Sequence, residues 1–194
     1  MREEVRRYWN ERHATGDAPG GGEPALFLVE HEHLLPREGR ALDVAMGSGR
    51  NALYLASLGL QVTGIDISEV AVQQAREESA RRGLAIEAIE GDVSSHDLGQ
   101  EQYDLIINFY FLDRGLASRL VEALKPGGLL VFETYTLAQL SLEGGPSNPQ
   151  WLLQPAELPL MFRGLKKLYY RDEVIEERGR KKAVASLIAR KPGG

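Results

Sequence analysis

Hydrophobic and polar positions follow two alternating periods through the middle of the chain. Short apolar runs of strand length are each followed by a stretch with apolar residues at helical spacing. The predicted strands are residues 41–45, 61–66, 85–92, 103–111 and 129–135, and the predicted helices are 50–58, 68–83 and 114–124. A regular alternation of strands and helices is typical of a parallel sheet covered by helices.

Residues with known preferences for helix ends support these boundaries. Ser68 is a suitable N-cap for the second helix, and Gly83 a suitable stop, because glycine tolerates the left-handed conformation there. Asp113 is in position to cap the third helix. The sequence KPGG at 125–128 predicts a sharp end to that helix and a turn before the fifth strand.

The two ends of the chain depart from this alternation. Before it, the pattern predicts a charged helix over 2–13, a turn-rich loop over 15–24 and a helix over 25–35 that Pro36 ends. After it come a long loop, a short helix near 155–162 and two β-rich runs, 165–175 and 180–190, separated by EERG. Such closely spaced runs favour an antiparallel pair. We therefore expect one doubly wound α/β domain whose mostly parallel, seven-stranded sheet ends in this pair and carries helices on both faces.

Composition narrows the classes of function. The chain has 194 residues, a net charge of −5 and no cysteine. The negative charge argues against nucleic acid as a partner, and the lack of cysteine excludes disulfides, thiolate metal sites and a cysteine nucleophile. No apolar run is long enough to span a bilayer, and the N-terminus lacks the apolar segment of a secretory signal. We expect a cytoplasmic protein that does not bind membranes.

Polar and glycine residues follow each of the first four predicted strands. Ligands of open parallel sheets bind beyond the carboxyl ends of the strands. There the sequence places the loop 47–51 with two glycines, then Asp66, then Asp92, and then Asn108 and its aromatic neighbours. Glycines let the backbone approach a ligand, the N-terminus of a helix favours an anionic group, and a carboxylate can accept from both hydroxyls of a ribose. One ligand of the nucleoside type could contact all four loops.

Two cofactor classes match this arrangement. The sequence GSGRNA at 47–52 satisfies the dinucleotide pattern G-x-G-x-x-[GA], with Asp66 about 20 residues further on, as that motif expects. Three features argue for another cofactor. Asp43 lies inside the first strand, where a dinucleotide has no obvious use for it. GDV at 91–93 offers a second acid for a base, and the chain ends in an antiparallel pair, not in a second mononucleotide-binding half.

Taken together, five segments resemble the class I S-adenosylmethionine-dependent methyltransferases, over roughly residues 40 to 190. These segments are ALDVAMGSGRNALYLASLG, VTGIDIS, GDV, YDLIINFYF and LKPGGLLVFETY. The start, YWNERHATGDAP followed by a helix, resembles the small tellurite-resistance-type branch, whose N-terminal arm is like that of thiopurine methyltransferases. The resemblance implies a Rossmann-like fold with an N-terminal helical arm or lid over 1–39, a cofactor-binding core over 40–135, and a substrate-side loop and C-terminal hairpin over 136–194.

The resemblance also implies roles for particular residues. Asp43 would hold the glycine loop or the cofactor ammonium, Asp66 the ribose, and Asp92 the adenine amino group. Arg12 could pair with the cofactor carboxylate under an aromatic cover. The implied cofactor-binding residues are Trp9, Arg12, Asp43, Gly47, Gly49, Arg50, Asn51, Asp66, Ile67, Asp92, Val93, Asn108 and Phe109, and the residues expected to line the substrate pocket are Tyr110, Phe111, Tyr135 and Trp151. Met46 departs from the small residue or cysteine common in the family, and would tighten the pocket around the methionine moiety.

The implied reaction is in-line methyl transfer from S-adenosylmethionine to a small nucleophile such as a thiol or a chalcogen oxyanion. No base, nucleophile or metal cluster is evident, so no catalytic residue is assigned. His31 and His33 would point to different faces of a helix, which argues against a metal site, and His13 and His96 are expected at the surface or as caps. Glu133, Tyr135 and the basic run 178–182 could face substrate, but the interpretation that we favour is a strand end and a solvated hairpin. The alternative functions are an NAD(P)-dependent oxidoreductase and a non-catalytic S-adenosylmethionine sensor or subunit. We expect a monomer or homodimer.

Overall fold

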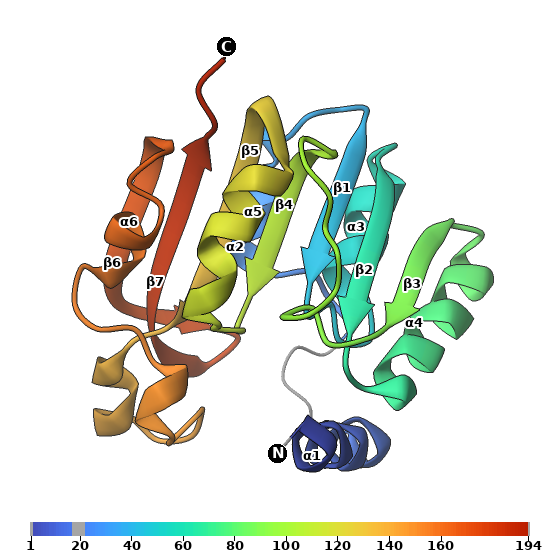
Figure 1. Ribbon diagram of the computed structural model, residues 1–194. Coiled ribbons are helices and arrows are strands. Elements are labelled where there is room, and N and C mark those ends of the chain that lie inside the picture. The colour runs from blue at the N-terminus through green and yellow to red at the C-terminus, as the bar shows by residue number, and fades with distance from the viewer. Residues whose placement is uncertain (1, 17–21, 194) are drawn as a thin grey trace. The chain divides into compact units, whose positions relative to one another are not determined.

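The computed structural model of the chain, which describes residues 2–16 and 22–193, contains a seven-stranded mixed sheet (Figure 1). The strand order is β3-β2-β1-β4-β5-β7-β6. The chain divides into two compact units, Met1–Asp97 and Leu98–Gly194. The predicted mixed sheet with a C-terminal antiparallel pair is confirmed, whereas the division into arm, core and substrate side stays a prediction.

The first unit holds three parallel strands and their helices. Its elements are α1 (Arg2–Thr15), α2 (Leu26–Glu30), η1 (Glu32–Leu34), β1 (Arg40–Val44), α3 (Arg50–Ser57), β2 (Gln61–Asp66), α4 (Glu69–Arg82) and β3 (Ile86–Glu90). Strand β2 pairs with β1 on one side and with β3 on the other, both in parallel. All three strands therefore direct their carboxyl ends toward one edge, which is where the predicted cofactor loops begin. Part of the predicted loop 15–24, residues 17–21, lies outside the described residues.

The predicted caps of α4 are confirmed, whereas the predicted helix over 25–35 is confirmed only in part. Ser68 accepts a hydrogen bond from the Ala71 N–H, and Gly83 adopts the left-handed conformation with φ 65°. The earlier segment breaks into α2 and η1 at His31, whose φ of −108° is not helical. The His31 ring donates from Nδ1 to the Phe27 carbonyl at 2.9 Å, so a side chain there competes with the backbone for a helical acceptor.

Met46 belongs to the hydrophobic core of this unit. It packs with Val72 and Ala75 of α4 and with residues of β3. A Cβ built on Gly64 of β2 would collide with the Met46 sulfur, so the missing side chain at 64 makes room for it. The expectation that Met46 narrows a ligand pocket is therefore wrong, since its side chain is buried between the sheet and α4.

The second unit holds the remaining strands. Its elements are β4 (Tyr103–Phe109), η2 (Arg114–Leu116), α5 (Ala117–Ala123), β5 (Leu124–Tyr135), η3 (Leu137–Ser141), η4 (Pro149–Trp151), α6 (Glu157–Met161), β6 (Lys166–Glu177) and β7 (Arg180–Arg190). Strand β5 pairs in parallel with β4 and antiparallel with β7, which in turn pairs antiparallel with β6. The turn between β6 and β7 is shorter than the predicted EERG, because β6 continues to Glu177.

The sequence KPGG ends α5 as predicted, but it is not a turn that precedes the strand. Strand β5 already begins at Leu124. Tyr103 pairs with Leu124 and Leu105 with Leu129, so two steps along β4 correspond to five along β5, and residues 125–128 bulge outward. A Cβ on Gly128 would lie 2.9 Å from the Lys125 carbonyl oxygen, which explains the glycine. The predicted cap Asp113 accepts from the Gly115 N–H at 2.9 Å, although the first turn is a 3₁₀ helix.

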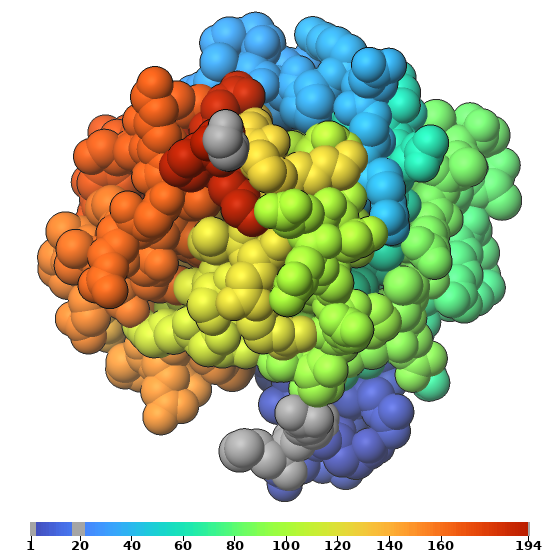
Figure 2. All heavy atoms as spheres, turned by 45° about the horizontal axis from the view of Figure 1, so that its top comes forward, coloured from blue at the N-terminus to red at the C-terminus, as the bar shows by residue number. Residues whose placement is uncertain are grey.

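The surface of the second unit carries several exposed apolar side chains. They belong to the segment 140–174, part of the orange region in Figure 2. The large apolar residues of this unit with at least 40% exposure are Leu140, Trp151, Leu160, Leu168 and Val174. Within residues 2–16 and 22–193, no helix is long and apolar enough to cross a membrane.

Candidate active site

The loop after β1 turns sharply on residues with positive φ. Gly47 has φ 58° and Gly49 has φ 82°, and even Ala45 adopts φ 53°. A Cβ on Gly49 would lie 2.9 Å from the Cβ of Ala75 in α4. Glycine at 49 therefore lets the start of α3 approach α4 closely, and the bare backbone of the loop lies at the carboxyl ends of the strands.

Asp43, near the end of β1, is a buried acid with one oxygen unused. Its side chain is 1% exposed and accepts from the Ala52 N–H, and its Oδ2 has no hydrogen-bond partner among the described residues. Burial raises the pKa of Asp43 to about 8; Arg50 opposes this shift, and the neighbouring Asp66 adds to it. A cation placed beside Oδ2 would stabilise the ionised form, so this carboxyl is suited to an ammonium group.

Asp66, at the end of β2, is held by the backbone of two loops. Its Oδ2 accepts from the Gly47 N–H and its Oδ1 from the Ser68 N–H, each at 2.8 Å. Burial raises its pKa, while the backbone donors and His13 oppose that shift. The Ile67 N–H also contributes a backbone hydrogen bond. Because a carboxylate has about four lone-pair positions, Asp66 retains capacity for a further donor such as a ribose hydroxyl.

The loop after β3 is tied to the same place. The Gly91 N–H donates to the Asp66 carbonyl at 2.8 Å. Asp92 accepts from the Ser94 N–H at 2.9 Å through Oδ1, which fixes the turn that follows. Val93 is buried. The first unit therefore brings the loops after β1, β2 and β3 together, as the sequence predicts.

Helix α1 lies against this site through two residues that sequence reasoning missed. The Ser68 hydroxyl donates to Asn10 Oδ1 at 2.7 Å. A Cβ on Gly47 would lie 3.4 Å from the ring of His13, and burial lowers the pKa of that ring. His13 is therefore not the surface residue that we expected. Arg6, Asn10 and His13 are spaced i, i+4, i+7 along the sequence, a pattern that places them on one helix face and could have indicated both residues.

Trp9 and Arg12 gather with Tyr8 on α1. The Arg12 guanidinium donates to the Tyr8 hydroxyl at 2.9 Å and lies 6.0 Å from the centre of the Trp9 ring. Both predicted residues are partly buried. Their contact with a cofactor stays a prediction.

Arg50 and Asn51 hold the preceding segment of the chain. Arg50 donates to the Glu23 carbonyl at 3.0 Å, and Asn51 Oδ1 accepts from the Ala25 N–H at 2.8 Å. Because Asn51 is buried, its amide secures the start of α2 against α3. A direct contact of either side chain with a cofactor stays a prediction.

In the second unit, the turn after β4 is built from buried polar contacts. Asn108 is 1% exposed and donates from Nδ2 to the Phe111 carbonyl at 2.9 Å. Tyr110 adopts φ 60° and donates its N–H to the Glu133 carbonyl at 2.8 Å. Its ring centre lies 5.1 Å from that of Tyr135. The carboxyl ends of β4 and β5 thus bring two of the predicted lining residues together, whereas Trp151 lies on η4 and is 43% exposed.

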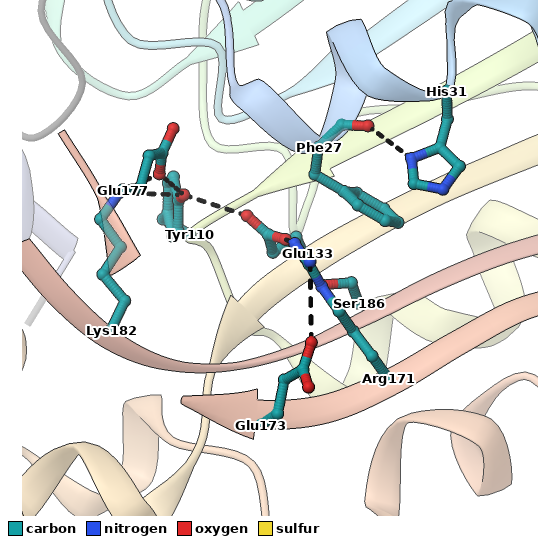
Figure 3. Close-up of polar contacts among 9 residues, drawn as sticks. All are labelled: Phe27, His31, Tyr110, Glu133, Arg171, Glu173, Glu177, Lys182 and Ser186. Carbon is teal, nitrogen blue, oxygen red and sulfur yellow. Dashed lines mark hydrogen bonds and ion pairs between the residues drawn. The ribbon is translucent and has the colours of Figure 1, made fainter. Parts of the chain in front are cut away.

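A cluster of charged residues surrounds the Tyr110 hydroxyl (Figure 3). Glu133 is 1% exposed and accepts from the Ser186 hydroxyl at 2.6 Å and from Arg171 at 3.1 Å. Glu177 is 4% exposed and pairs with Lys182. Glu133 is therefore part of a buried network and not merely a strand end, and Lys182 belongs to that network and not to a solvated hairpin.

Comparison with known proteins decides the family. A methyltransferase-domain family model matches residues 41–128. The ubiquinone biosynthesis O-methyltransferase of Burkholderia ambifaria is 30% identical over 160 residues, which cover 71% of this chain and 67% of that protein. This chain belongs to the class I S-adenosylmethionine-dependent methyltransferases. That membership argues against the oxidoreductase alternative.

A sequence match with TehB supports the predicted tellurite-resistance-type branch of the methyltransferases, and a structural match with TehB shows the shared fold. The probable S-adenosyl-L-methionine-dependent methyltransferase TehB of Haemophilus influenzae is 33% identical over 136 residues, or 69% of this chain and 45% of that protein. The crystal structure of TehB from H. influenzae has the same fold, with a TM-score of 0.72 and 24% identity over 84% of this chain and 61% of that one. The chain spans about half the length, or less, of the first curated relatives that it matches.

The first unit of this methyltransferase fits the cofactor that gives the family its name. S-adenosylmethionine carries an ammonium group, a carboxylate, a ribose diol and an adenine. The unpartnered Oδ2 of buried Asp43 suits the ammonium, and the remaining hydrogen-bond capacity of Asp66 suits a hydroxyl of the diol. In the described part of the chain, no group of three or more His, Cys, Asp or Glu residues could hold a metal ion.

Proposed function

We propose that this methyltransferase transfers the methyl group of S-adenosylmethionine to a small nucleophilic acceptor. The observation that carries the proposal is the buried Asp43, whose Oδ2 has no hydrogen-bond partner among the described residues, one loop away from the remaining hydrogen-bond capacity of Asp66. Leaving a buried polar atom without a partner costs free energy. A ligand with an ammonium group and a ribose would remove that cost and use both acids at once.

The cofactor assignments follow from this pair of acids. Asp43 would accept from the ammonium, Asp66 from the ribose hydroxyls, and Asp92 from the adenine amino group. The bare backbone at Gly47 and Gly49 would contact the amino-acid end. The other predicted contacts, carried over from the family resemblance, are Trp9, Arg12, Arg50, Asn51, Ile67, Val93, Asn108 and Phe109.

The chain's own residues would mainly position the reactants. When bound, S-adenosylmethionine supplies a methyl group that is already activated by the positive charge on sulfur. Fixing two reactants in line removes much of the entropic barrier to displacement, and excluding water strengthens the electrostatic interactions that hold them. The carboxylates and the glycine loop would fix the cofactor in place. The acceptor side would be lined by the aromatic residues Tyr110, Phe111, Tyr135 and Trp151.

The acceptor that we propose is a small molecule with a thiol, a chalcogen oxyanion or a similar nucleophile. The relative named for ubiquinone biosynthesis is an O-methyltransferase, which adds hydroxyl-bearing acceptors to the panel. We further propose a cytoplasmic location and a monomer or homodimer.

Calorimetry and turnover together test the function. Titration with S-adenosylmethionine should show binding, whereas titration with NADH should show none. The protein is then offered tellurite, selenite, aliphatic and aromatic thiols and phenols, and the product S-adenosylhomocysteine is detected. Binding of NADH alone would refute the proposal, and cofactor binding without turnover of any acceptor would favour the sensor alternative.

Substitution of the ribose-side acid tests the cofactor site. Asp66→Ala should weaken the binding of S-adenosylmethionine by about 1–3 kcal/mol, because buried hydrogen bonds to the diol would be lost. Glu77→Ala is the control, since Glu77 is an exposed acid on α4 that pairs with Gln73. Calorimetry on both variants, after urea unfolding has verified that each is folded, measures the difference. Equal affinities for the two variants would rule out the ribose role.

A further inference from the structure

The hydroxyl of Tyr110 is in contact with several charged side chains of the second unit (Figure 3). Its oxygen is 3.0 Å from Glu133 Oε1 and 3.2 Å from Glu177 Oε2, and Lys182 Nζ donates to it at 3.2 Å. The Lys182 ammonium also lies 4.7 Å from the centre of the Tyr110 ring. Such a concentration of acids and bases around one phenol is unusual for a residue that only packs.

The single proton of the Tyr110 hydroxyl has more than one possible acceptor. A phenol carries one hydrogen, yet the Tyr110 oxygen lies within hydrogen-bond distance of two carboxylates. The hydroxyl proton therefore has two acceptors. Arg171 pairs with both Glu133 and Glu173, and Lys182 pairs with Glu177. When Glu133 takes up a proton, Arg171 therefore keeps Glu173 as an anionic partner.

The members of the cluster differ in how far their side chains are exposed to solvent. Glu133 is 1% exposed and Glu177 is 4% exposed, whereas Tyr110 is only partly buried. Of these three residues, only Tyr110 has a side chain that is not fully buried, so it is the member of the cluster that a substrate could contact. Tyr110 also directly follows β4 with φ 60°. The carboxyl end of a parallel strand is where ligands bind in such sheets.

We propose that Tyr110 is a catalytic residue that removes a proton from the methyl acceptor and relays its own proton to Glu133. The acceptor is then a proton-bearing group, such as a thiol or a phenol, and not an oxyanion. Glu133 is the receiving acid because its oxygen lies 3.0 Å from the Tyr110 oxygen, closer than the 3.2 Å of Glu177. This inference rests on the proposed function, whose acceptor it narrows.

The relay moves two protons and transfers one methyl group. The bond between the acceptor atom and its hydrogen breaks, and the proton passes to the Tyr110 oxygen. The original hydroxyl proton of Tyr110 moves to Glu133 Oε1. The electron pair left on the acceptor atom forms its new bond to the methyl carbon, and the pair of the broken carbon–sulfur bond stays on sulfur. The proton on Glu133 returns to solvent through Tyr110 once the product has left.

Removal of the hydroxyl tests the relay. Tyr110→Phe keeps the ring and should lower kcat with thiols and phenols by about 10²-fold or more, the usual contribution of a general base. Affinity for S-adenosylmethionine should stay within twofold in calorimetry. Tyr54→Phe is the matched control, because it removes another hydroxyl that donates to a carboxylate, that of Glu32 in the first unit, and its kcat should equal that of the unaltered protein.

A pH profile separates a relay from a purely structural role. The charged groups that face Tyr110 or its partners are Glu133 on β5, Arg171, Glu173 and Glu177 on β6, and Lys182 on β7. In the unaltered protein, the rate should fall at low pH as this cluster takes up a proton. In Tyr110→Phe, the rate should instead rise about tenfold per pH unit up to the pKa of the acceptor itself, because only acceptor that is already ionised can then react.

Each result supports or overturns the relay. A Tyr110→Phe variant with the original rate, or one that is equally slow with selenite and with thiols, would overturn it. So would an unaltered protein that methylates only oxyanions. If the unaltered protein binds cofactor but methylates nothing, the proposed function fails first, and the relay fails with it. Should Tyr110→Phe not fold in a thermal melt, Glu133→Gln, which keeps the shape of the acid but accepts no proton, must show the same loss of kcat.

Discussion

The buried carboxyl groups of the two units are stabilised in different ways. In the first unit, Asp43 and Asp66 are held by backbone N–H groups, and burial raises the pKa of each. In the second unit, Glu133 and Glu177 each form an ion pair with a cationic side chain. A buried acid without a paired cation is costly, so a cationic ligand gains most in the first unit. A buried acid that is already paired gains less from such a ligand.

The largest effect should follow from breaking an ion pair in the second unit. Arg171→Met should reduce the free energy of unfolding by about 3–5 kcal/mol, because Glu133, which is 1% exposed, would lose its cationic partner. Urea unfolding measures the change. Arg6→Met is the control: Arg6 pairs with Glu3 in an exposed contact, and an exposed ion pair contributes little to stability. Equal losses of unfolding free energy in the two variants would show that the Arg171–Glu133 pair stabilises the protein no more than an exposed pair does.

The next largest effect concerns Asp43 in the first unit and depends on pH. The folded pKa of about 8 exceeds the ordinary value of 3.8, so between these values the folded state binds more protons than the unfolded state. Stability contributed by this group is therefore present at low pH and is lost as pH rises. Asp43→Asn removes the titration.

Unfolding in urea at pH 5 and pH 7 measures this difference. The free energy of unfolding of the unaltered protein, relative to Asp43→Asn, should fall by about 3 kcal/mol between the two pH values, from 1.36 kcal/mol per pH unit. Using the variant at the same pH as the reference cancels the titration of other groups. Parallel pH curves for the two proteins would mean that other groups of the first unit compensate the cost of ionising the buried Asp43 carboxyl. The contrast between the two units would then disappear.

The smallest effect concerns the contact of α1 with the first unit. Asn10→Ala removes the acceptor of the Ser68 hydroxyl and should destabilise the docking of α1 by about 1 kcal/mol. Hydrogen exchange of the α1 amides measures it, with Glu11→Ala, an exposed residue of the same helix, as the control. Unchanged exchange rates in Asn10→Ala would show that α1 is held by contacts other than this one.

The parts of the fold that local chemistry determines could be predicted from the sequence. Strands β1 and β2 and helix α4 were predicted because their hydrophobic periods and their end residues, such as Ser68 and Gly83, lie within the segment itself. The break at His31 could not be predicted, because it depends on the rotamer of one ring near the Phe27 carbonyl. The bulge at 125–128 depends on the register with β4, which lies 20 residues away in the chain.

The same distinction applies to the candidate site. The loops with Gly47, Asp66 and Asp92 were predicted because each directly follows a strand, and strand ends can be located from the pattern. The cluster around Tyr110 could not be predicted, because its members come from β5, β6, β7 and the end of β4, and only pairing of those strands brings them together. Likewise, the place of His13 depends on how α1 docks and not on the sequence near residue 13.

Gly64 and Met46 occupy what is in effect a single shared volume. Because a Cβ at 64 would overlap the Met46 sulfur, neither site is free to vary alone. A larger residue at 64 needs a smaller one at 46, and a cysteine or small residue at 46 leaves a void unless the residue at 64 is larger. The two positions should therefore change in concert during evolution, as a linked pair in which the first mutation is harmful until the second arrives.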